Sequence, residues 1–306
     1  MEKVTTIVYD REPLRILPFQ DRSIASFISD SDENTDKKTI ESFGLEWNAF
    51  NSFEDAELEN IGNEYFDIIN ETHINSTSTV LDVGCGTGRW SRYISGKVAQ
   101  VEAIDPSDAV MNAVQFNSGI KNIRVSQAGV DCIPFADESF DLVFSLGVLH
   151  HIPDTQKAMQ SCVQKVKKGG HFLVYLYYDL DNRGFLFRAL FRFSNLFRRA
   201  ICKLPFGLKK AVCTTIAFLV YFPLARTGTL FKRLFPTSGF YEKIPLFYYH
   251  NKSFHIMKND ALDRFGTPLE QRFTKQQIAD MMSRCGLSEL VFSTKTPYWH
   301  AVGKKA

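Results

Sequence analysis

Paired cysteines, metal-ligand clusters and long apolar runs are all missing from this chain of 306 residues. Its six cysteines are scattered, and no two of them form a Cys-x-x-Cys pair. The tight histidine pair His150–His151 has no cysteines near it, so we expect no metal site. Residues 1–15 carry charges and no apolar core, unlike a secretory signal. Free thiols without a signal pattern predict a cytoplasmic protein.

Acidic residues are absent from one long segment. From Arg183 to Tyr241 there are eleven basic residues and no acidic one, whereas the rest of the chain has 25 basic and 34 acidic residues. The net charge of +2 therefore hides a strongly basic segment in an otherwise acidic chain. Such a segregated charge predicts an anionic partner for this segment.

The basic segment is also amphipathic. On a helix at 100° per residue, Arg188, Arg192, Arg199 and Lys203 fall within a stripe of roughly 60°. Apolar residues spread over the other side: Leu186, Leu190, Phe193, Leu196, Phe197 and Ile201. A second run, AVCTTIAFLVYF, has only twelve residues before Pro223, and a spanning helix needs ~20. We expect a helical lid, a peripheral contact with an anionic membrane, or both.

A glycine-rich turn and a distant acid are the most informative features present. Residues 80–90 read VLDVGCGTGRW, a short apolar run that leads into Gly84, Gly86 and Gly88. Glycines there allow a tight turn and let backbone N–H groups approach a ligand closely. A second apolar run, VEAID, ends at Asp105, whose carboxylate can accept hydrogen bonds from ribose hydroxyls. The dinucleotide fingerprint G-x-G-x-x-G is not met, because Arg89 stands at the third glycine position.

The motif G-x-G-x-G after an acidic strand residue resembles the class I S-adenosylmethionine-dependent methyltransferases, with a methyltransferase-11-like core. The stretch AGVDCIPFADESFDLVFSLGVLHHI at 128–152 is similar to the same family. The resemblance is strong over about 75–180 and weaker over 272–304. It implies S-adenosyl-L-methionine as the cofactor. The stretch before the core, FGLEWNAF, is similar to one in many enzymes of surface-polysaccharide pathways. By this resemblance Trp47 and Phe50 either cover the cofactor pocket or belong to the hydrophobic core.

The resemblance assigns cofactor roles to particular side chains and backbone groups. Asp82 would hold the amino group of the methionine part, and Ser145 would flank that part through its backbone. In the family an acid caps the adenine amino group, but this chain has Gly129 at that position. The neighbouring Val130 N–H and the Asp131 carboxylate are the remaining candidates for adenine. The expected cofactor-binding residues are therefore Asp82, Gly84, Gly86, Gly88, Asp105, Val130, Asp131 and Ser145.

Two histidines are the candidate catalytic residues. His150 and His151 follow the predicted strand 141–145, in the loop that faces the acceptor in the resembling family. Imidazole has a pKa near 6.5, which suits a general base. His151 is the first choice and His150 the second, with Tyr177 or His250 as fallbacks. The alternative is that both histidines only form hydrogen bonds within the loop.

The core alternates strands and helices, which predicts an α/β fold with a doubly wound, Rossmann-like parallel sheet. Gly169–Gly170 is expected to end the helix before the fifth strand. The last helix is expected from Thr274, followed by a hairpin. Strands are expected at 79–83, 100–104, 122–126, 141–145 and 171–177, with helices near 88–96, 107–115 and 154–167. Four segments result: an N-terminal part with a helical cap (1–74), the cofactor-binding core (75–180), a basic, aromatic-rich helical insertion (181–271), and the final helix and hairpin (272–306).

Methyl transfer to an oxygen of a sugar or lipid-linked glycan is the first functional hypothesis, by analogy with polysaccharide biosynthesis enzymes. The alternatives are methylation of a small hydrophobic metabolite, such as a quinone, and a non-catalytic scaffold of this fold that docks on the inner membrane surface. Nucleic acid is not expected as a partner, because the chain has no recognisable RNA-binding module. The amino-acid sequence does not specify the oligomeric state.

Overall fold

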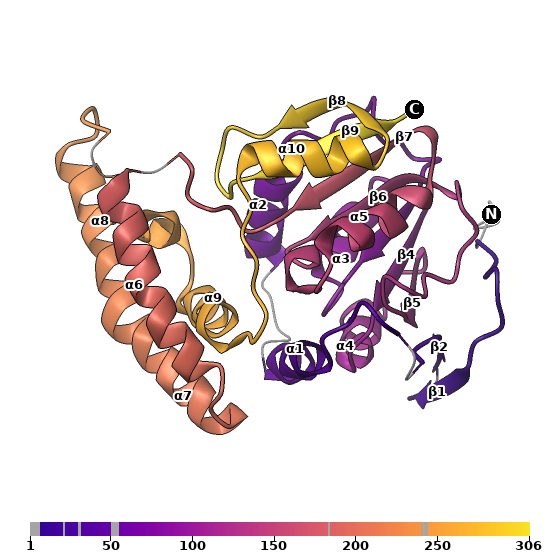
Figure 1. The fold of residues 1–306 in the computed structure, drawn as a ribbon, viewed down its shortest axis with the longest axis horizontal. Coiled ribbons are helices and arrows are strands. Elements are labelled where there is room, and N and C mark those ends of the chain that lie inside the picture. Colours follow the sequence, from indigo (N-terminus) through magenta and orange to yellow (C-terminus); the bar gives the residue numbers. More distant parts are fainter. Residues whose placement is uncertain are drawn as a thin grey trace. The chain divides into compact units, whose positions relative to one another are not determined.

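The computed structural model describes residues 7–20, 22–29, 32–49, 55–182, 184–239, 241 and 244–306, with only the backbone described at 48, 49 and 186. Phe50, one of the two expected pocket aromatics, lies outside these residues. The chain divides into two compact units (Figure 1). Unit 1 comprises Met1–Asp181 and Leu269–Ala306, and unit 2 comprises Asn182–Pro268.

Unit 1 is organised around one sheet of order β1-β2-β5-β4-β3-β6-β7-β9-β8 (Figure 1). Its six adjacent strands from β2 to β7 pair in parallel, and the hairpins at the two edges are antiparallel. The strand order reverses between β3 and β6, which confirms the predicted doubly wound sheet. The strands are β1 (Arg15–Phe19), β2 (Arg22–Ser26), β3 (Thr79–Val83), β4 (Gln100–Asp105), β5 (Ile123–Gln127), β6 (Phe140–Leu146), β7 (Val166–Tyr175), β8 (Leu287–Phe292) and β9 (His300–Lys305).

Helices cover both faces of the sheet, because side chains on both faces are buried. Along β3, Leu81 and Val83 pack into a core shared with α5 and α10, while Asp82 points to α3 and bonds Ser91. This alternation places helices on both faces, as in a doubly wound fold. The last helix begins after Thr274, whose side chain caps it in a capping box. The helices are α1 (Lys37–Ala49), α2 (Asp55–Tyr65), α3 (Arg89–Ser95), α4 (Ala109–Phe116), α5 (Thr155–Gln164) and α10 (Lys275–Arg284).

Two features of the sheet differ from the expectation. The strand β7 begins at Val166, so Gly169–Gly170 lies inside it and does not precede it. Val166 pairs with Phe140, and the pairing resumes at His171 after a register shift. Gly169 has φ +77°, a conformation that suits glycine and lets the strand bulge there without ending.

The second difference is the hairpin β1–β2, which extends the sheet beyond β5 and was not expected. Phe27 N–H donates to the carbonyl of Gln127 at 2.8 Å and continues the pairing between β2 and β5. The preceding segment is held by Arg124, which pairs with buried Glu102 at 2.7 Å and stacks on Tyr9. The N-terminal part is therefore built into the sheet as well as into the helical cap.

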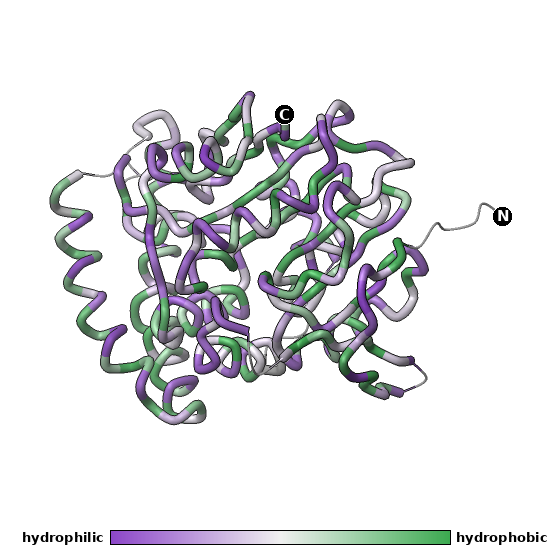
Figure 2. The backbone as a smooth tube through the Cα atoms, turned by 45° about the vertical axis from the view of Figure 1, so that its right-hand side comes forward, coloured by the Kyte–Doolittle hydropathy of each residue, from purple (hydrophilic) through white to green (hydrophobic). Residues whose placement is uncertain are grey.

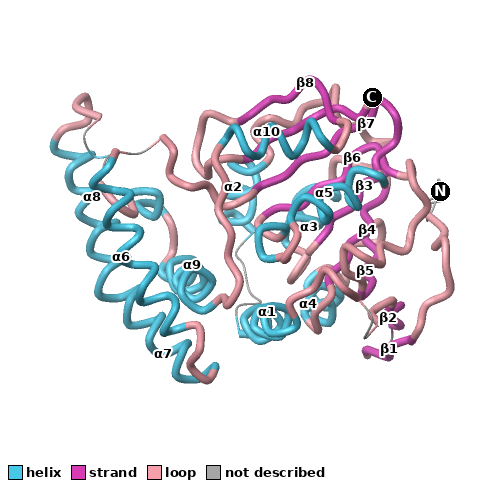
Figure 3. Tube along the Cα trace, in the orientation of Figure 1, coloured by secondary structure: helices cyan, strands magenta, loops and turns pink. Residues whose placement is uncertain are grey.

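The described part of unit 2 consists of helices joined by loops and turns (Figure 3). They are α6 (Phe185–Ile201), α7 (Phe206–Ile216), the π-helical η2 (Ala217–Tyr221), α8 (Phe222–Leu234), the 3-10 helix η4 (Phe247–Asn251) and α9 (Phe254–Gly266).

The expectation that the apolar helix ends before Pro223 is wrong. The segments α7, η2 and α8 are continuous over Phe206–Leu234. A proline lacks an N–H group and clashes with the preceding turn of a regular helix. The wider π turn of η2 comes directly before Pro223 and accommodates its ring. Among the described residues this helix alone is long and apolar enough to cross a membrane by length and composition.

Candidate functional site

The glycine turn after β3 lies at the switch point of the sheet. Gly84, Gly86 and Gly88 all have positive φ, at +80°, +54° and +74°. A Cβ atom on Gly84 would lie 2.5 Å from the methyl groups of Val148, in the loop after β6. Only glycine fits both this backbone conformation and this close approach. The turn therefore brings the carboxyl ends of β3 and β6 together, where ligands bind in open α/β sheets.

Asp105 ends β4 and connects to the same turn. Its carboxylate accepts hydrogen bonds from Gly86 N–H at 2.9 Å and from the N–H and hydroxyl of Ser107 at 2.9 and 2.6 Å. A carboxylate has about four lone-pair sites, so one acceptor position remains for a ligand hydroxyl. Burial raises the pKa of Asp105, and the hydrogen bonds from Ser107 and Gly86 oppose that shift.

A second buried acid, Asp82, lies close to Asp105. Burial raises the pKa of Asp82 to about 7, the hydrogen bond from Ser91 lowers it, and the neighbouring Asp105 raises it further. The Ser91 hydroxyl donates to Asp82 Oδ2 at 2.6 Å. Two buried acids in one place favour a positively charged ligand, because its charge would stabilise their ionised forms.

Aromatic side chains and an arginine border the turn. The Arg89 guanidinium stacks between Trp47 and Trp90, 5.0 and 4.5 Å from their ring centroids. Trp47 lies directly against the turn, since a Cβ on Gly86 would be 3.0 Å from its indole nitrogen. The sequence suggested Trp47 as a pocket residue, but it indicated Arg89 only as a departure from a glycine fingerprint. The stacking depends on α1 packing beside the turn, which no local pattern predicts.

The segment expected to face adenine follows β5. Val130 is buried there, and the Asp131 carboxylate accepts a hydrogen bond from the Asn34 N–H at 2.6 Å. The Asn34 side chain in turn exchanges two hydrogen bonds with the backbone of Asp154. Asp131 therefore anchors the segment before α1, and its suggested role toward adenine stays a prediction.

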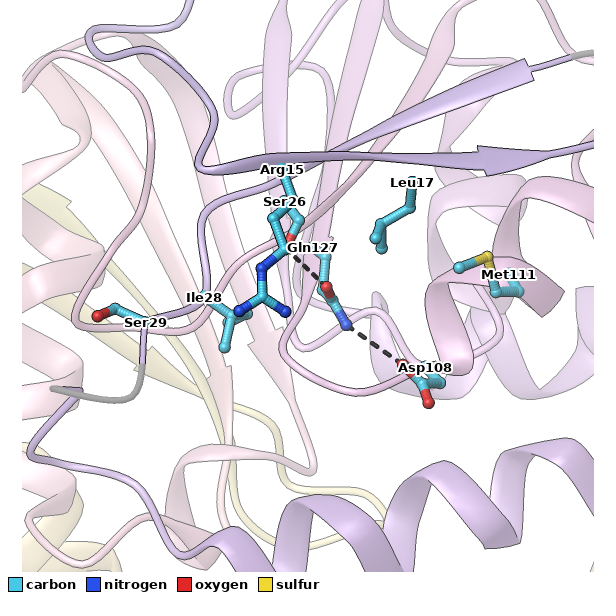
Figure 4. A pocket seen from close by; sticks show the side chains of 8 residues that line it. All are labelled: Arg15, Leu17, Ser26, Ile28, Ser29, Asp108, Met111 and Gln127. Atoms are coloured by element: carbon cyan, nitrogen blue, oxygen red, sulfur yellow. Dashed lines mark hydrogen bonds between the residues drawn. The ribbon is translucent and has the colours of Figure 1, made fainter.

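A cavity of about 420 Å³ is lined by residues of the hairpin β1–β2, the end of β5 and the start of α4 (Figure 4). Gln127 crosses it, accepting from Ser26 at 2.7 Å and donating to Asp108 at 3.4 Å. Asp108 follows Asp105 by three residues, so the cavity adjoins the loop that carries the ribose candidate. Its lining residues are Arg15, Leu17, Ser26, Ile28, Ser29, Asp108, Met111 and Gln127.

The end of β6 is tied to the end of β3. The fully buried Ser145 hydroxyl donates to the carbonyl of Val83 at 2.9 Å. Its side chain is thus structural, and the expected backbone contact with the methionine part stays a prediction.

His150 and His151 lie in the 3-10 turn η1 (Leu149–His151), which follows β6. The fully buried His150 ring lies 4.0 Å from His151 and 3.9 Å from Tyr177, and neither of its nitrogens has a hydrogen-bond partner among the described residues. Burial, with His151 and Arg272 nearby, lowers the pKa of His150 well below 6.5, so its ring is neutral.

His151 has a defined tautomer. Its Nδ1 lies 2.7 Å from the carbonyl oxygen of Leu269, and a carbonyl can only accept. Nδ1 therefore carries the proton, and in the neutral ring the lone pair is on Nε2. Of the fallback residues, Tyr177 contacts both histidines, whereas His250 belongs to unit 2.

No group of three or more metal-ligating side chains exists among the residues that the structure describes.

A comparison with family models matches residues 81–174 to a methyltransferase domain. Residues 81–174 form a class I S-adenosylmethionine-dependent methyltransferase domain. The matched segment of this methyltransferase domain runs from β3 to β7. It contains all the predicted cofactor-binding residues and both histidines.

The relatives match about a third of this chain. The chain is 28% identical over 102 residues to the uncharacterized methyltransferase YcgJ of Bacillus subtilis, covering 32% of this chain and 40% of that protein. It is 30% identical over 114 residues to a ubiquinone biosynthesis O-methyltransferase of Alkalilimnicola ehrlichii, covering 36% and 46%. The chain thus spans less than half the length of either relative. The solved structure of YcgJ superposes with a TM-score of 0.44 at 17% identity, covering 82% of this chain and 70% of that one.

Proposed function

We propose that this protein transfers a methyl group from S-adenosylmethionine to an oxygen atom of an acceptor. The observation that carries the proposal is the joint placement of the glycine turn and Asp105 at the switch point. The glycine backbone of the turn lies beside a carboxylate that still has one acceptor position.

The residues present fit this cofactor. Asp105 would accept a ribose hydroxyl, and the glycine turn would let the methionine part approach the backbone closely. The buried Asp82 and Asp105 suit a cofactor with positive charge on its sulfonium and amino groups. Trp47 would cover the turn and keep water away. The adenine amino group would contact the segment around Val130, because Gly129 stands where the family has an acid.

The cofactor supplies an activated methyl group, so the protein has to position the acceptor and remove its proton. A hydroxyl group is a weak nucleophile until it loses that proton. We infer that His151 is the general base, since its Nδ1 bond to Leu269 leaves the lone pair on Nε2. The bond from the oxygen to the methyl carbon forms as the bond from carbon to sulfur breaks. The proton goes to His151 Nε2.

A sugar or lipid-linked glycan is our first candidate for the acceptor. The support is the aromatic stretch before the core, which places Trp47 at the turn, together with the basic and apolar unit 2. A pyrophosphoryl lipid would offer both anionic and apolar surface. The protein would then act in the cytoplasm, and its six free cysteines fit a reducing compartment.

A quinone precursor is the second candidate. It is supported by the similarity to a ubiquinone biosynthesis O-methyltransferase. Both candidate acceptors carry a hydroxyl group that must lose a proton, so both call for the same base.

The test measures S-adenosylhomocysteine release when the protein is incubated with S-adenosylmethionine and either lipid-linked glycans or quinone precursors. We expect His151→Ala to lower turnover by at least about a hundredfold while leaving the affinity for S-adenosylhomocysteine nearly unchanged. The wild-type rate should rise with pH as the imidazole loses its proton. The matched control is His73→Ala, in the turn after α2, which should retain wild-type turnover.

The outcomes separate the parts of the proposal. Normal turnover of His151→Ala would remove this residue from the mechanism and favour an amine acceptor, which needs less activation. Binding of NADH more tightly than S-adenosylhomocysteine would overturn the cofactor assignment. Cofactor binding without methyl transfer to any acceptor tried would favour the scaffold hypothesis.

A further inference from the structure

We propose that unit 2 binds peripherally to a membrane surface that contains anionic lipids, through α6 and the long helix Phe206–Leu234. We call the outward side chains of these two helices the docking face. The proposal does not depend on the methyl-transfer reaction, because it rests on the surface of unit 2 alone.

Exposed apolar side chains are concentrated in unit 2. Of the 18 large hydrophobic side chains that are exposed among the described residues, 13 belong to this unit. Figure 2 shows the alternation of hydrophobic and hydrophilic residues along its helices. The 13 residues are Phe185, Leu190, Phe193, Leu196, Phe197, Leu208, Phe218, Leu219, Val220, Phe222, Leu230, Leu234 and Phe235. A concentration of this kind marks an interaction surface.

The helix α6 has three distinct sides. One side packs within unit 2, where Arg198 is buried and donates to the carbonyl of Thr267. The predicted basic stripe is exposed: Arg188, Arg192 and Arg199 lie on α6, and Lys203 lies in the turn directly after it. The next part of the surface is apolar and exposed: Leu190, Phe193, Leu196 and Phe197. A basic stripe beside an apolar stripe on one exposed surface is the pattern of a helix that lies in a membrane interface.

The apolar exposure is not a result of poor packing within the unit. The long helix buries its inner side, including Cys213, Ala217, Tyr221 and Ala225. Lys209, on the same side, donates to the carbonyl of Gly266 at 2.9 Å. With Arg198, it satisfies carbonyl groups at the C-terminal end of α9, where cations are favourable. The inner sides of α6 and of the long helix are thus packed and hydrogen-bonded within unit 2. The exposed apolar side chains on the outer sides are therefore available to a partner outside the chain.

Charge decides between a membrane and a second copy of the chain. The segment from Arg183 to Tyr241 has no acidic residue, so two copies of the docking face would bring like charges together. The four basic residues of the α6 stripe have no ion-pair partner in the described part of the chain. Anionic lipid headgroups complement these charges, and the acyl region complements the apolar side chains.

The helix Phe206–Leu234 is long enough to span a membrane, but its uncharged stretch and its packing favour a position on the surface. Between Lys210 and Arg226 the long helix has fifteen uncharged residues. At ~1.5 Å per residue they cover about 22 Å, which is less than the ~30 Å hydrocarbon core. The helix also packs along its inner side against α9, which carries Lys258, Asp260 and Asp263. We therefore assign a peripheral position.

The experiment uses the full chain and vesicles of phosphatidylcholine with or without about one third phosphatidylglycerol, in a co-sedimentation assay. We expect the protein to bind the anionic vesicles and to be released as salt rises, because exposed charges are screened over ~8 Å at physiological ionic strength. Neutralising the stripe (R188Q, R192Q, R199Q and K203Q together) should weaken the binding at least about tenfold. The matched control neutralises four exposed basic residues of unit 1 (K38Q, K121Q, K168Q and R284Q) and should bind as the wild type does.

A second variant tests the apolar contact. Phe218→Trp places a fluorophore on the docking face, and its emission is expected to shift to the blue on anionic vesicles and to be quenched by brominated lipids. Salt-sensitive binding without quenching would mean an electrostatic contact only and would overturn the docking face as stated. Equal loss in the unit 1 control would show that net charge alone matters. No binding to anionic vesicles at low salt, or dimerisation through this face, would also overturn the proposal.

Discussion

At the residue scale, Asp82 is a carboxylate whose environment opposes its negative charge. It is buried beside Asp105, and its pKa is raised to about 7 from an ordinary value of 3.8. Between about pH 4 and pH 7 the folded protein therefore binds more protons at this site than the unfolded chain does. Stability contributed by Asp82 must then fall as the pH rises through this window. A positively charged ligand would offset that cost.

We therefore expect Asp82→Asn to raise the melting temperature of the ligand-free protein at pH 8. A difference of three pKa units corresponds to about 4 kcal/mol at most, so an increase of several degrees is expected. The gain over wild type should shrink toward pH 4, where Asp82 is protonated in both states. The variant should also bind S-adenosylmethionine more weakly, because it loses a negative charge. Thermal unfolding at both pH values and calorimetry measure these effects.

The control for this prediction is Asp179→Asn, at an exposed carboxylate of unit 1. It should change neither the melting temperature nor its pH dependence by more than a small amount. Glu102 is also buried, and its pKa is raised to about 7. Its contribution to the pH dependence of stability is the same in the wild type and in both variants. If Asp82→Asn destabilised the protein equally at both pH values, the raised pKa would not be the cause of its effect.

At the element scale, the turn between β3 and α3 depends on what the loop after β6 places against it. Gly84 has φ +80°, and Val148 occupies the space that a side chain would need. We expect Gly84→Ala to destabilise the protein by about 1–3 kcal/mol and to weaken cofactor binding, through backbone strain and overpacking. Denaturant unfolding and calorimetry measure the two effects.

The matched control is Gly96→Ala, at the end of α3. Gly96 has φ −71°, and a Cβ there would meet no atom within 4 Å. It should be neutral or slightly stabilising, because alanine restricts the unfolded chain at no steric cost. Equal stability of both variants would contradict the close approach of Val148 to the turn.

Elements differ in how far the sequence predicts them. The strands β3 to β6 and helices α3 to α5 follow from short apolar runs, glycines and helix periodicity, which are local signals. The hairpin β1–β2 depends on pairing with β5, a partner about a hundred residues away in sequence. The helix through Pro223 depends on a π turn, for which the sequence carries no separate signal. Both were therefore missed.

At the scale of the whole molecule, the two units divide the chemistry. All nine strands of the sheet and every predicted cofactor-binding residue belong to unit 1. Unit 2 carries 13 of the 18 large hydrophobic side chains that are exposed in the described part of the chain. The segment that leads out of unit 1 into unit 2 pairs with the segment that leads back into unit 1. Phe273 N–H donates to the carbonyl of Tyr177, and Asp179 N–H donates to the carbonyl of Phe273. Unit 2 is thus a true insertion in the chain order of the sheet.

We expect replacement of Asn182–Pro268 by a Gly/Ser linker of about sixteen residues, with an end-to-end distance of roughly 20–24 Å, to leave unit 1 folded. The shortened protein should bind S-adenosylhomocysteine with an affinity close to that of the full chain, because the site residues lie outside the deleted part. It should no longer bind anionic vesicles. Circular dichroism, calorimetry and co-sedimentation measure the three properties. Retained vesicle binding would place the membrane contact in unit 1.

The sequence by itself determined the glycine turn, Asp105, the parallel sheet and the segregation of basic residues, because each depends on short-range sterics, chain order or composition. Tertiary structure alone decided how these groups are used. Asp105 bonds to the turn because β4 pairs with β3, and Arg89 stacks on Trp47 because α1 packs beside α4. It also decided that the apolar side of α6 stays exposed, since amphipathic periodicity shows that a helix has two sides but not which one its neighbours cover.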